Sequence, residues 1–227
     1  MEVYLAEKYG SHMAQPSGWI VELGEDEYHH KFGGESWQVI DPRCVYGGPT
    51  LLLSLNLNDP KLRSLQRNGI HELPMCSYVN CDAWTSKQIF QINPKTQSVI
   101  LIGREKISPK PLDEEDKFPS PILEKKVRLR SMKDEEYPTS EELYWQACDD
   151  FVGGAAFIRV LGPPLWMQWV EREICSCGLD MEYVCSIGYE SYSEGYLDSK
   201  PFFIGEGALY FFLCSTCLKE VVIFQAT

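Results

Sequence analysis

The sequence lacks any apolar run that approaches the roughly 20 residues needed to cross a membrane as a helix. Its N-terminus also lacks the basic start and the apolar core of a secretory signal peptide. Both absences favour a cytoplasmic protein with no membrane partner. A chain of 227 residues has room for one large domain or two small ones.

Positive charge is scarce as well. The chain has 21 Lys and Arg residues against 33 Asp and Glu residues, which gives a formal net charge of −12. Such a surface repels phosphate backbones, so we expect no nucleic-acid partner. It attracts a basic protein and speeds association with it. The alternative is that this charge serves solubility alone.

Recognisable catalytic motifs are missing too. His71-Glu72 lacks the second histidine of a metalloprotease motif, and there is no Gly-x-Ser-x-Gly phrase and no phosphate-binding loop. Cys148 precedes Asp149-Asp150, whose charges raise a thiol pKa and so disfavour a nucleophile. We therefore predict no catalytic residues and no enzyme activity. An enzyme assembled from distant positions is the third choice, behind two binding roles.

Cysteine, by contrast, is abundant, and the sequence around it is repeated. Residues 72–92 and 209–226 each run from an apolar lead-in through a cysteine pair to Ile-Phe-Gln. Echoes with Gly, Trp and Cys lie upstream, over 32–47 and 161–178. Two halves built on one plan predict a duplicated module. Nine cysteines without an export signal predict reduced thiols, clustered for metal binding or packing rather than for disulfides.

Short apolar runs bounded by Gly, Asp and Pro predict strands along most of the chain. The expected fold class is α+β and β-rich, with two similar antiparallel sheet modules from the internal duplication and few short helices. The expected organisation is a mobile or tag-like lead (1–18), a first β-rich repeat (19–103), a charged, proline-rich linker plus a short helix (104–150), and a second β-rich repeat (151–227).

Local signals place two helices and one optional strand. Asp59-Pro60 predicts a short helix, with Asp as N-cap and Pro at the first helical position. Thr-Ser-Glu-Glu at 139–142 resembles a capping box and predicts a helix of about ten residues toward Asp150. Within the linker, Lys126–Leu129 is an option for an edge strand.

The second half contains a complete set of four thiols. Two close cysteine pairs, separated along the chain, are the layout of a zinc knuckle, because a tetrahedral ion needs ligands converging from two turns. An extended strand would point the thiols of a Cys-x-Cys pair apart, so the first pair needs a turn, which Gly178 permits. We predict a structural zinc ion here; the alternative is reduced cysteines packed in a core. The ligands would be Cys175, Cys177, Cys214 and Cys217.

The first half has only a partial counterpart of this set. Cys44, Cys76 and Cys81 match three of the four thiols, and Tyr46 takes the fourth place. Three thiols and a tyrosine are a poor zinc site, although His71 could substitute for the tyrosine. We therefore expect metal only in the second half.

An acidic, tyrosine-rich stretch follows at residues 189–198. Tyrosine in an acidic loop suits a protein interface, because it offers a large contact area at low entropic cost. The alternative is a solvated loop. The residues that we expect to contact a partner are Tyr189, Glu190, Tyr192, Glu194 and Asp198.

Three phrases resemble the YwqG-like bacterial domain of unknown function. They are Leu161-Gly-Pro-Pro-Leu-Trp-Met-Gln168, Cys175-x-Cys-Gly-x-x-Met181 and Gly205-x-Gly-x-x-Tyr-x-Phe-x-Cys-x-x-Cys217. The resemblance covers residues 157–225 and, more faintly, 32–92. The chain departs from the family pattern at Pro163, which replaces a glycine, and in a first cysteine pair one residue shorter. The resemblance implies an internally duplicated, β-rich fold.

The family also implies two binding roles. Members occur beside polymorphic toxins as candidate immunity proteins, and similar patterning occurs in eukaryotic chaperones that shield a basic small-subunit ribosomal protein. With the acidic charge, this resemblance predicts a cytoplasmic, non-enzymatic protein-binding module, most concretely an immunity protein that neutralises a basic toxin through an acidic face. The alternative is a chaperone for a basic client such as a ribosomal protein.

Overall fold

The structure of the protein is a computed structural model. It describes residues 18–42, 48–67, 69–105, 108–133, 136, 140–190, 195–198 and 200–227. The predicted lead therefore lies outside the described residues, apart from Gly18, which begins the first strand.

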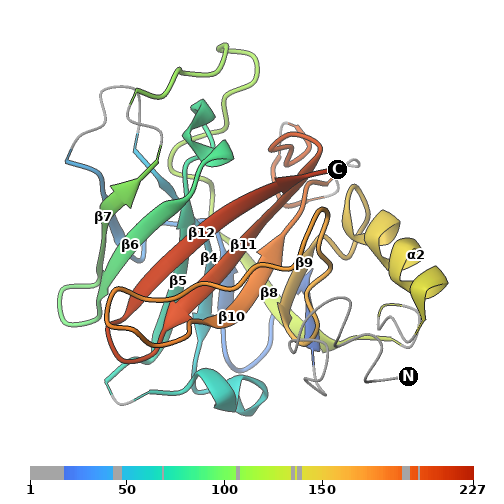
Figure 1. The fold of residues 1–227 in the computed structure, drawn as a ribbon, viewed down its shortest axis with the longest axis horizontal. Helices are drawn as coiled ribbons and strands as arrows, with labels where there is room; N and C mark the ends of the chain where they lie inside the picture. Colours follow the sequence, from blue (N-terminus) through green and yellow to red (C-terminus); the bar gives the residue numbers. More distant parts are fainter. Residues whose placement is uncertain are drawn as a thin grey trace.

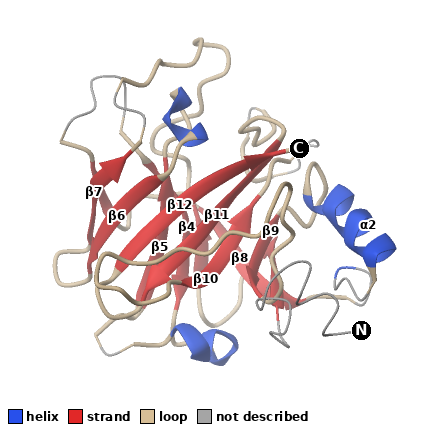
Figure 2. Ribbon diagram, viewed as in Figure 1, coloured by secondary structure: helices blue, strands red, loops and turns tan. Residues whose placement is uncertain are grey.

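Within the described residues, the strands form one twelve-stranded sheet. Their bounds are β1 (Gly18–Leu23), β2 (His30–Phe32), β3 (Gln38–Ile40), β4 (Thr50–Asn56), β5 (Glu72–Ser77), β6 (Gln88–Asn93), β7 (Ser98–Arg104), β8 (Lys125–Ser131), β9 (Ile158–Leu161), β10 (Glu182–Ile187), β11 (Gly207–Cys214) and β12 (Lys219–Ala226). The helical segments of this described part are η2 (Pro60–Leu65), η3 (Asp82–Thr85) and α2 (Glu141–Phe151). Figure 2 shows how far strands outweigh helices.

The strand order is β3-β7-β6-β12-β11-β10-β9-β1-β8-β2-β4-β5. Every pairing is antiparallel except that of β3 with β7. The sheet curls so that β4 and β5 lie behind β11 and β12 (Figure 1). The backbone N–H of Cys76 in β5 donates to Oε1 of Glu220 in β12 at 3.2 Å, and the N–H of Tyr78 donates to Oε1 of Gln88 at 3.1 Å. Side chains thus join the two walls across the interior.

The β-rich class is confirmed, but the two modules are not present as separate sheets. Strand β12 lies between β6 and β11, so the strands of the two halves interleave in one sheet. The linker prediction also needs correction, because β8 lies between β1 and β2 rather than at an edge. Strand β8 is paired on both sides because its alternating residues Val127 and Leu129 are buried in the core.

Strand β11 is buried on both faces, and its residues alternate between two cores. Leu209 and Phe211 belong to the larger core inside the curled sheet. Tyr210 and Phe212 belong to a second core, which α2 and segment 165–181 cover. This alternation follows from the two-residue period of a strand. It explains why β11 reads as a continuous apolar run.

Both predicted helices are present, although the cap of α2 lies one residue after the first position of the predicted capping box. Asp59 caps η2, because its Oδ1 accepts the backbone N–H of Lys61 at 2.8 Å. Ser140 caps α2 by accepting the N–H of Leu143 at 3.2 Å. No helix in the described part of the chain is long and apolar enough to span a membrane.

Helix α2 is fixed to segment 165–181 by the hydroxyl of Tyr144. This buried hydroxyl accepts the backbone N–H of Trp166 at 2.6 Å and donates to the backbone carbonyl of Trp166 at 3.0 Å. Replacing Tyr144 with Phe leaves both backbone groups buried without this partner. We expect the free energy of unfolding to fall by about 1–3 kcal/mol in urea titration, with an unchanged m-value. A loss below about 0.5 kcal/mol would contradict this role.

Candidate metal centre

The first cysteine pair lies on a tight turn rather than on a strand. The backbone N–H of Cys175 donates to the carbonyl of Leu179 at 2.9 Å, and the N–H of Gly178 donates back to the carbonyl of Cys175 at 2.8 Å. Gly178 has a φ of 87°, a left-handed conformation that glycine adopts without strain. This turn removes the difficulty of the short Cys-x-Cys spacing, since the two thiols no longer alternate in direction.

The second cysteine pair lies on the turn between β11 and β12. Cys214 is the last residue of β11, and Cys217 precedes the start of β12. The N–H of Leu218 donates to the carbonyl of Cys214 at 2.8 Å, and Leu218 has a φ of 54°. The tight reversal brings both thiols to the same end of the hairpin.

The four thiols converge, as predicted. The Sγ atoms of Cys175, Cys177, Cys214 and Cys217 all lie within 4.8 Å of one another. The Cys177 and Cys214 sulfurs are 3.7 Å apart. A zinc–sulfur bond of about 2.3 Å places neighbouring sulfurs of a tetrahedral site about 3.8 Å apart. The described geometry therefore matches the donor set and spacing of a tetrathiolate zinc site.

The thiols perturb one another's pKa values. Burial opposes ionisation of Cys175, but hydrogen bonds from the Cys177 backbone and from the neighbouring thiols lower its pKa to about 7. Hydrogen bonding to Cys177, together with burial, raises the pKa of Cys217 to about 12. Burial also raises the pKa of Cys214. Cys175 thus ionises near neutral pH, whereas Cys214 and Cys217 resist ionisation.

The surroundings fit a structural site with limited solvent access. Cys175 and Cys214 are buried, Cys217 is half-buried and Cys177 is exposed. Lys219 lies beside them, with Nζ 2.6 Å from Oγ of Ser176, and its positive charge would offset part of the charge of bound thiolates. Four protein ligands leave no open coordination position, so the site suits a structural role.

The matching cysteines of the first half form no such cluster. Cys76 and Cys81 are buried in the larger core. Burial, reinforced by Glu220, raises the pKa of the Cys76 thiol well above its ordinary value. Cys44 and Tyr46 lie outside the described residues. Among the described residues, neither Cys76 nor Cys81 belongs to a metal-ligand group.

A second group of potential ligands, which the sequence did not reveal, contains Asp26, His30 and Asp59. Nδ1 of His30 accepts the backbone N–H of Asn56 at 3.0 Å, so Nε2 carries the proton that it shares with Oδ2 of Asp59 at 3.1 Å. Burial lowers the pKa of His30 and keeps the ring neutral. Both ring nitrogens are thus committed, and the group is structural. No local motif marks His30, because its partners come from distant positions.

Cys148 does not form a nucleophilic site. It is a residue of α2, and its thiol is buried in the second core. Burial, with a contribution from Asp149, raises its pKa to about 12. The predicted direction was correct, although burial is the larger cause.

The acidic tyrosine stretch is only partly at the surface. Tyr189 is half-buried with its ring edge-on to Phe203 at 5.1 Å, and exposed Asp198 pairs with Lys125 at 2.6 Å. Glu190 is 7% exposed, so its prediction as a surface contact needs correction. Its N–H donates to the carbonyl of Phe202 at 2.7 Å, which draws it into the fold. The other two predicted contacts, Tyr192 and Glu194, lie outside the described residues.

Glu190 instead lines a cavity of about 340 Å³. Glu22, Arg130 and Tyr196 also line it. The Tyr196 hydroxyl donates to the backbone carbonyl of Val21 at 3.0 Å. Burial raises the pKa of Tyr196, and Glu190 adds to this shift. The residues that line this cavity thus include two acids, Glu22 and Glu190, and one arginine, Arg130.

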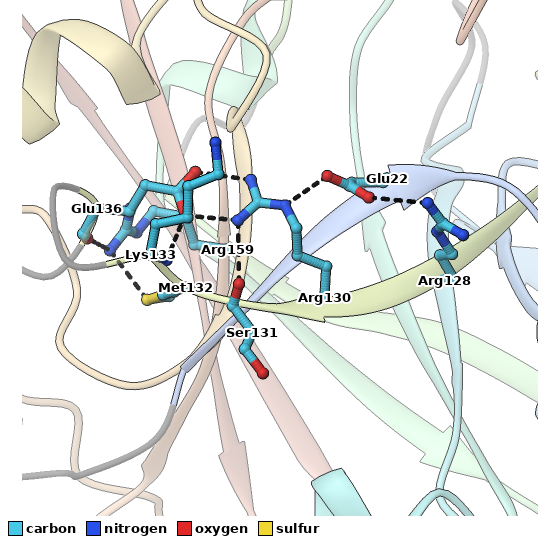
Figure 3. Close-up of polar contacts among 8 residues, drawn as sticks. All are labelled: Glu22, Arg128, Arg130, Ser131, Met132, Lys133, Glu136 and Arg159. Carbon is cyan, nitrogen blue, oxygen red and sulfur yellow. Dashed lines mark hydrogen bonds and ion pairs between the residues drawn. The ribbon is translucent and has the colours of Figure 1, made fainter.

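Glu22 and Arg130, which line this cavity, belong to a chain of alternating charges (Figure 3). Arg130 forms a two-pronged contact with Glu136, at 2.5 and 2.6 Å, and its Nε pairs with Glu22. Arg128 pairs with the other oxygen of Glu22 at 3.4 Å. Buried Arg159 donates to the backbone carbonyl of Glu136 at 2.7 Å. The network joins β1, β8 and β9. The carboxylates of Glu22 and Glu136 pair with arginines of β8, whereas Arg159 is joined to them through the backbone carbonyl of Glu136, so the network is structural.

Comparisons with known proteins give no relative for this chain. No family model matches it, and neither a curated protein nor a solved structure does. The assignment of the four cysteines as a metal site therefore rests on their geometry alone.

Proposed function

We propose that this protein is a zinc-stabilised, non-enzymatic module that binds a basic protein. The convergence of four cysteine sulfurs within 4.8 Å carries the zinc part of the proposal. Zinc would be held by Cys175, Cys177, Cys214 and Cys217, and it would supply a structural crosslink rather than chemistry.

The crosslink would join two segments that are otherwise held by few contacts. Among the described residues, the polar contacts of segment 173–181 with the sheet include the ion pair of Glu173 with Lys87 and the hydrogen bond from Lys219 to Ser176. The β11–β12 hairpin forms the wall against which this segment packs, through Cys175 and Met181 in the second core. Zinc would therefore fix the cover of that core.

The partner part of the proposal rests on charge. A net charge of −12 favours a basic partner and raises the association rate at low salt. The most concrete form is an immunity protein that neutralises a basic toxin, with Tyr189 and Asp198 among its contacts. We also propose that the chain is related to the YwqG-like domain and arose by internal duplication, because sequence phrases that are repeated along the chain support both.

Co-expression with the product of the adjacent gene tests this role. We expect the two proteins to form a complex whose association rate falls at least about 10-fold between 0.05 and 0.5 M NaCl, because salt screens the charges. We also expect the protein to restore growth of cells that produce the partner. A partner that is harmless without this protein would contradict an immunity role. Loss of solubility of a ribosomal-type client on deletion would support the chaperone role instead.

A further inference from the structure

An apolar groove of about 290 Å³ opens at one end of the molecule. Three segments far apart in the sequence form it: η3 with Val79, residues 112–118, and residues 200–205. They gather at the top of the view in Figure 1. The groove lies apart from the four cysteines, none of which lines it.

Three aromatic side chains line the groove: Trp84, Phe118 and Phe203. Phe203 is 49% exposed although it is a large apolar residue. Trp84 is half-buried and packs edge-on against Phe224 at 4.5 Å. A Cβ atom at Gly205 would lie 2.5 Å from Cη2 of Trp84, so glycine is what allows the indole ring to lie here. Tyr189, predicted to contact a partner, packs edge-on against Phe203, with 5.1 Å between the ring centres.

The rim of this groove is acidic. Residues 113–116 form four consecutive acids, all of them exposed. Glu114 pairs with Lys117 at 2.5 Å. The carboxylates of Asp113, Glu115 and Asp116 have no basic partner among the described residues. The rim therefore presents negative charge to whatever enters the groove.

The lysine that lines the groove, Lys200, offsets only part of the charge of the four rim acids. Nζ of Lys200 lies 4.9 Å from the ring centre of Phe118 and 3.0 Å from the backbone carbonyl of Glu115. Its ammonium group is thus used to fix residues 112–118 to residues 200–205. An incoming partner meets unpaired carboxylates around an exposed phenyl ring.

We propose that this groove binds a basic segment of a partner protein, which inserts one aromatic or large aliphatic side chain beside Phe203. Charge complementarity selects this occupant: arginine or lysine residues flanking the anchor would face Glu115 and Asp116. A volume of about 290 Å³ suits one such side chain with its flanking backbone. The inference rests on the proposed binding of a basic protein and assigns a surface to it.

A labelled nonapeptide, Lys-Arg-Lys-Arg-Phe-Arg-Lys-Arg-Lys, is the probe for this site. We expect Phe203→Ala to weaken its binding at least about 10-fold in fluorescence anisotropy, because buried aromatic anchors carry most of the binding energy. The matched control is Trp145→Ala on α2, where the ring is 51% exposed and does not line the groove. This control should bind as the wild type does.

The rim is tested by charge neutralisation. We expect the pair Glu115→Gln and Asp116→Asn to weaken binding about 5-fold and to flatten its salt dependence. The control pair is Glu142→Gln and Asp149→Asn, two exposed acids of α2. An equal loss from both pairs would mean attraction by net charge alone and would overturn the site.

Three further outcomes would overturn the inference. They are equal binding of a peptide with Gly in place of Phe, equal binding of an uncharged peptide with the same Phe, and a dimer in sedimentation that Phe203→Ala dissociates. The last would assign the groove to a second copy of this chain. If the gene neighbour's product binds Phe203→Ala as it binds the wild type, only the groove fails. If the gene neighbour's product binds neither the wild type nor Phe203→Ala, the proposed function fails as well.

Discussion

Replacing Cys214 with Ser is expected to abolish stoichiometric zinc binding and to destabilise the protein strongly. The wild type, purified under reducing conditions, should contain one zinc ion per chain, because its four sulfurs lie within 4.8 Å of one another. Free zinc at about 1,000 times its dissociation constant stabilises the folded state by about 4 kcal/mol. For a chain of this size, that corresponds to a melting temperature about 8–16 °C lower without the metal. Metal analysis and thermal unfolding measure the two effects.

The matched control for this experiment is Cys148→Ser. Cys148 is also buried, but it does not belong to the four-thiol group. This variant should retain one zinc ion per chain. A chelator should lower the melting temperature of the wild type and of Cys148→Ser alike, and should leave Cys214→Ser unchanged. Less than about 0.1 zinc per wild-type chain after refolding with excess zinc would eliminate the site.

Replacing Glu220 with Gln is expected to remove a large pH dependence of stability. Glu220 is 1% exposed inside the curled sheet, and burial raises its pKa well above its ordinary value. The folded state therefore holds a proton that the unfolded chain releases near pH 4.3. The stability that this proton contributes is complete below that pH and is lost as the pH rises toward the folded-state pKa. The slope is about 1.4 kcal/mol per pH unit over that window.

Urea titration at several pH values between 5 and 8 measures this slope. Glutamine keeps the acceptor for the N–H of Cys76, so Glu220→Gln should be more stable than the wild type at the upper end, with the gap widening as the pH rises. Glu142→Gln, at an exposed position of α2, should follow the wild-type curve. Parallel curves for wild type and Glu220→Gln would show that Glu220 ionises in the folded state as freely as in the unfolded chain.

The metal centre illustrates how far local patterns reach. The spacing of Cys214 and Cys217 identified one half of the ligand set, because a Cys-x-x-Cys turn presents both thiols in the same direction. The sequence repeat then identified Cys175 and Cys177. Their short spacing allows both thiols to bind one ion only if the backbone turns between them. The structure shows this turn, which ends at Gly178.

The role of Glu220 shows where local patterns stop. Alternation along β12 places Glu220 on the same face as Val222 and Phe224, and both of these contact the larger core. From the sequence pattern alone, a charged residue at the end of such a face could equally well be exposed to solvent at the end of the strand. Only the curling of the sheet brings Cys76 of β5 over it and buries the carboxyl group.

The sequence by itself determined the β-rich class, the helix cap at Asp59, the presence of helix α2 and the four candidate ligands. Each of these follows from residues that are neighbours along the chain or from a repeated phrase. Tertiary structure decided the single interleaved sheet, the inclusion of β8 within it, the burial of Glu190 and the groove beside Phe203. These features depend on which distant segments bury one another's apolar faces, and that is a property of the whole chain rather than of any local pattern.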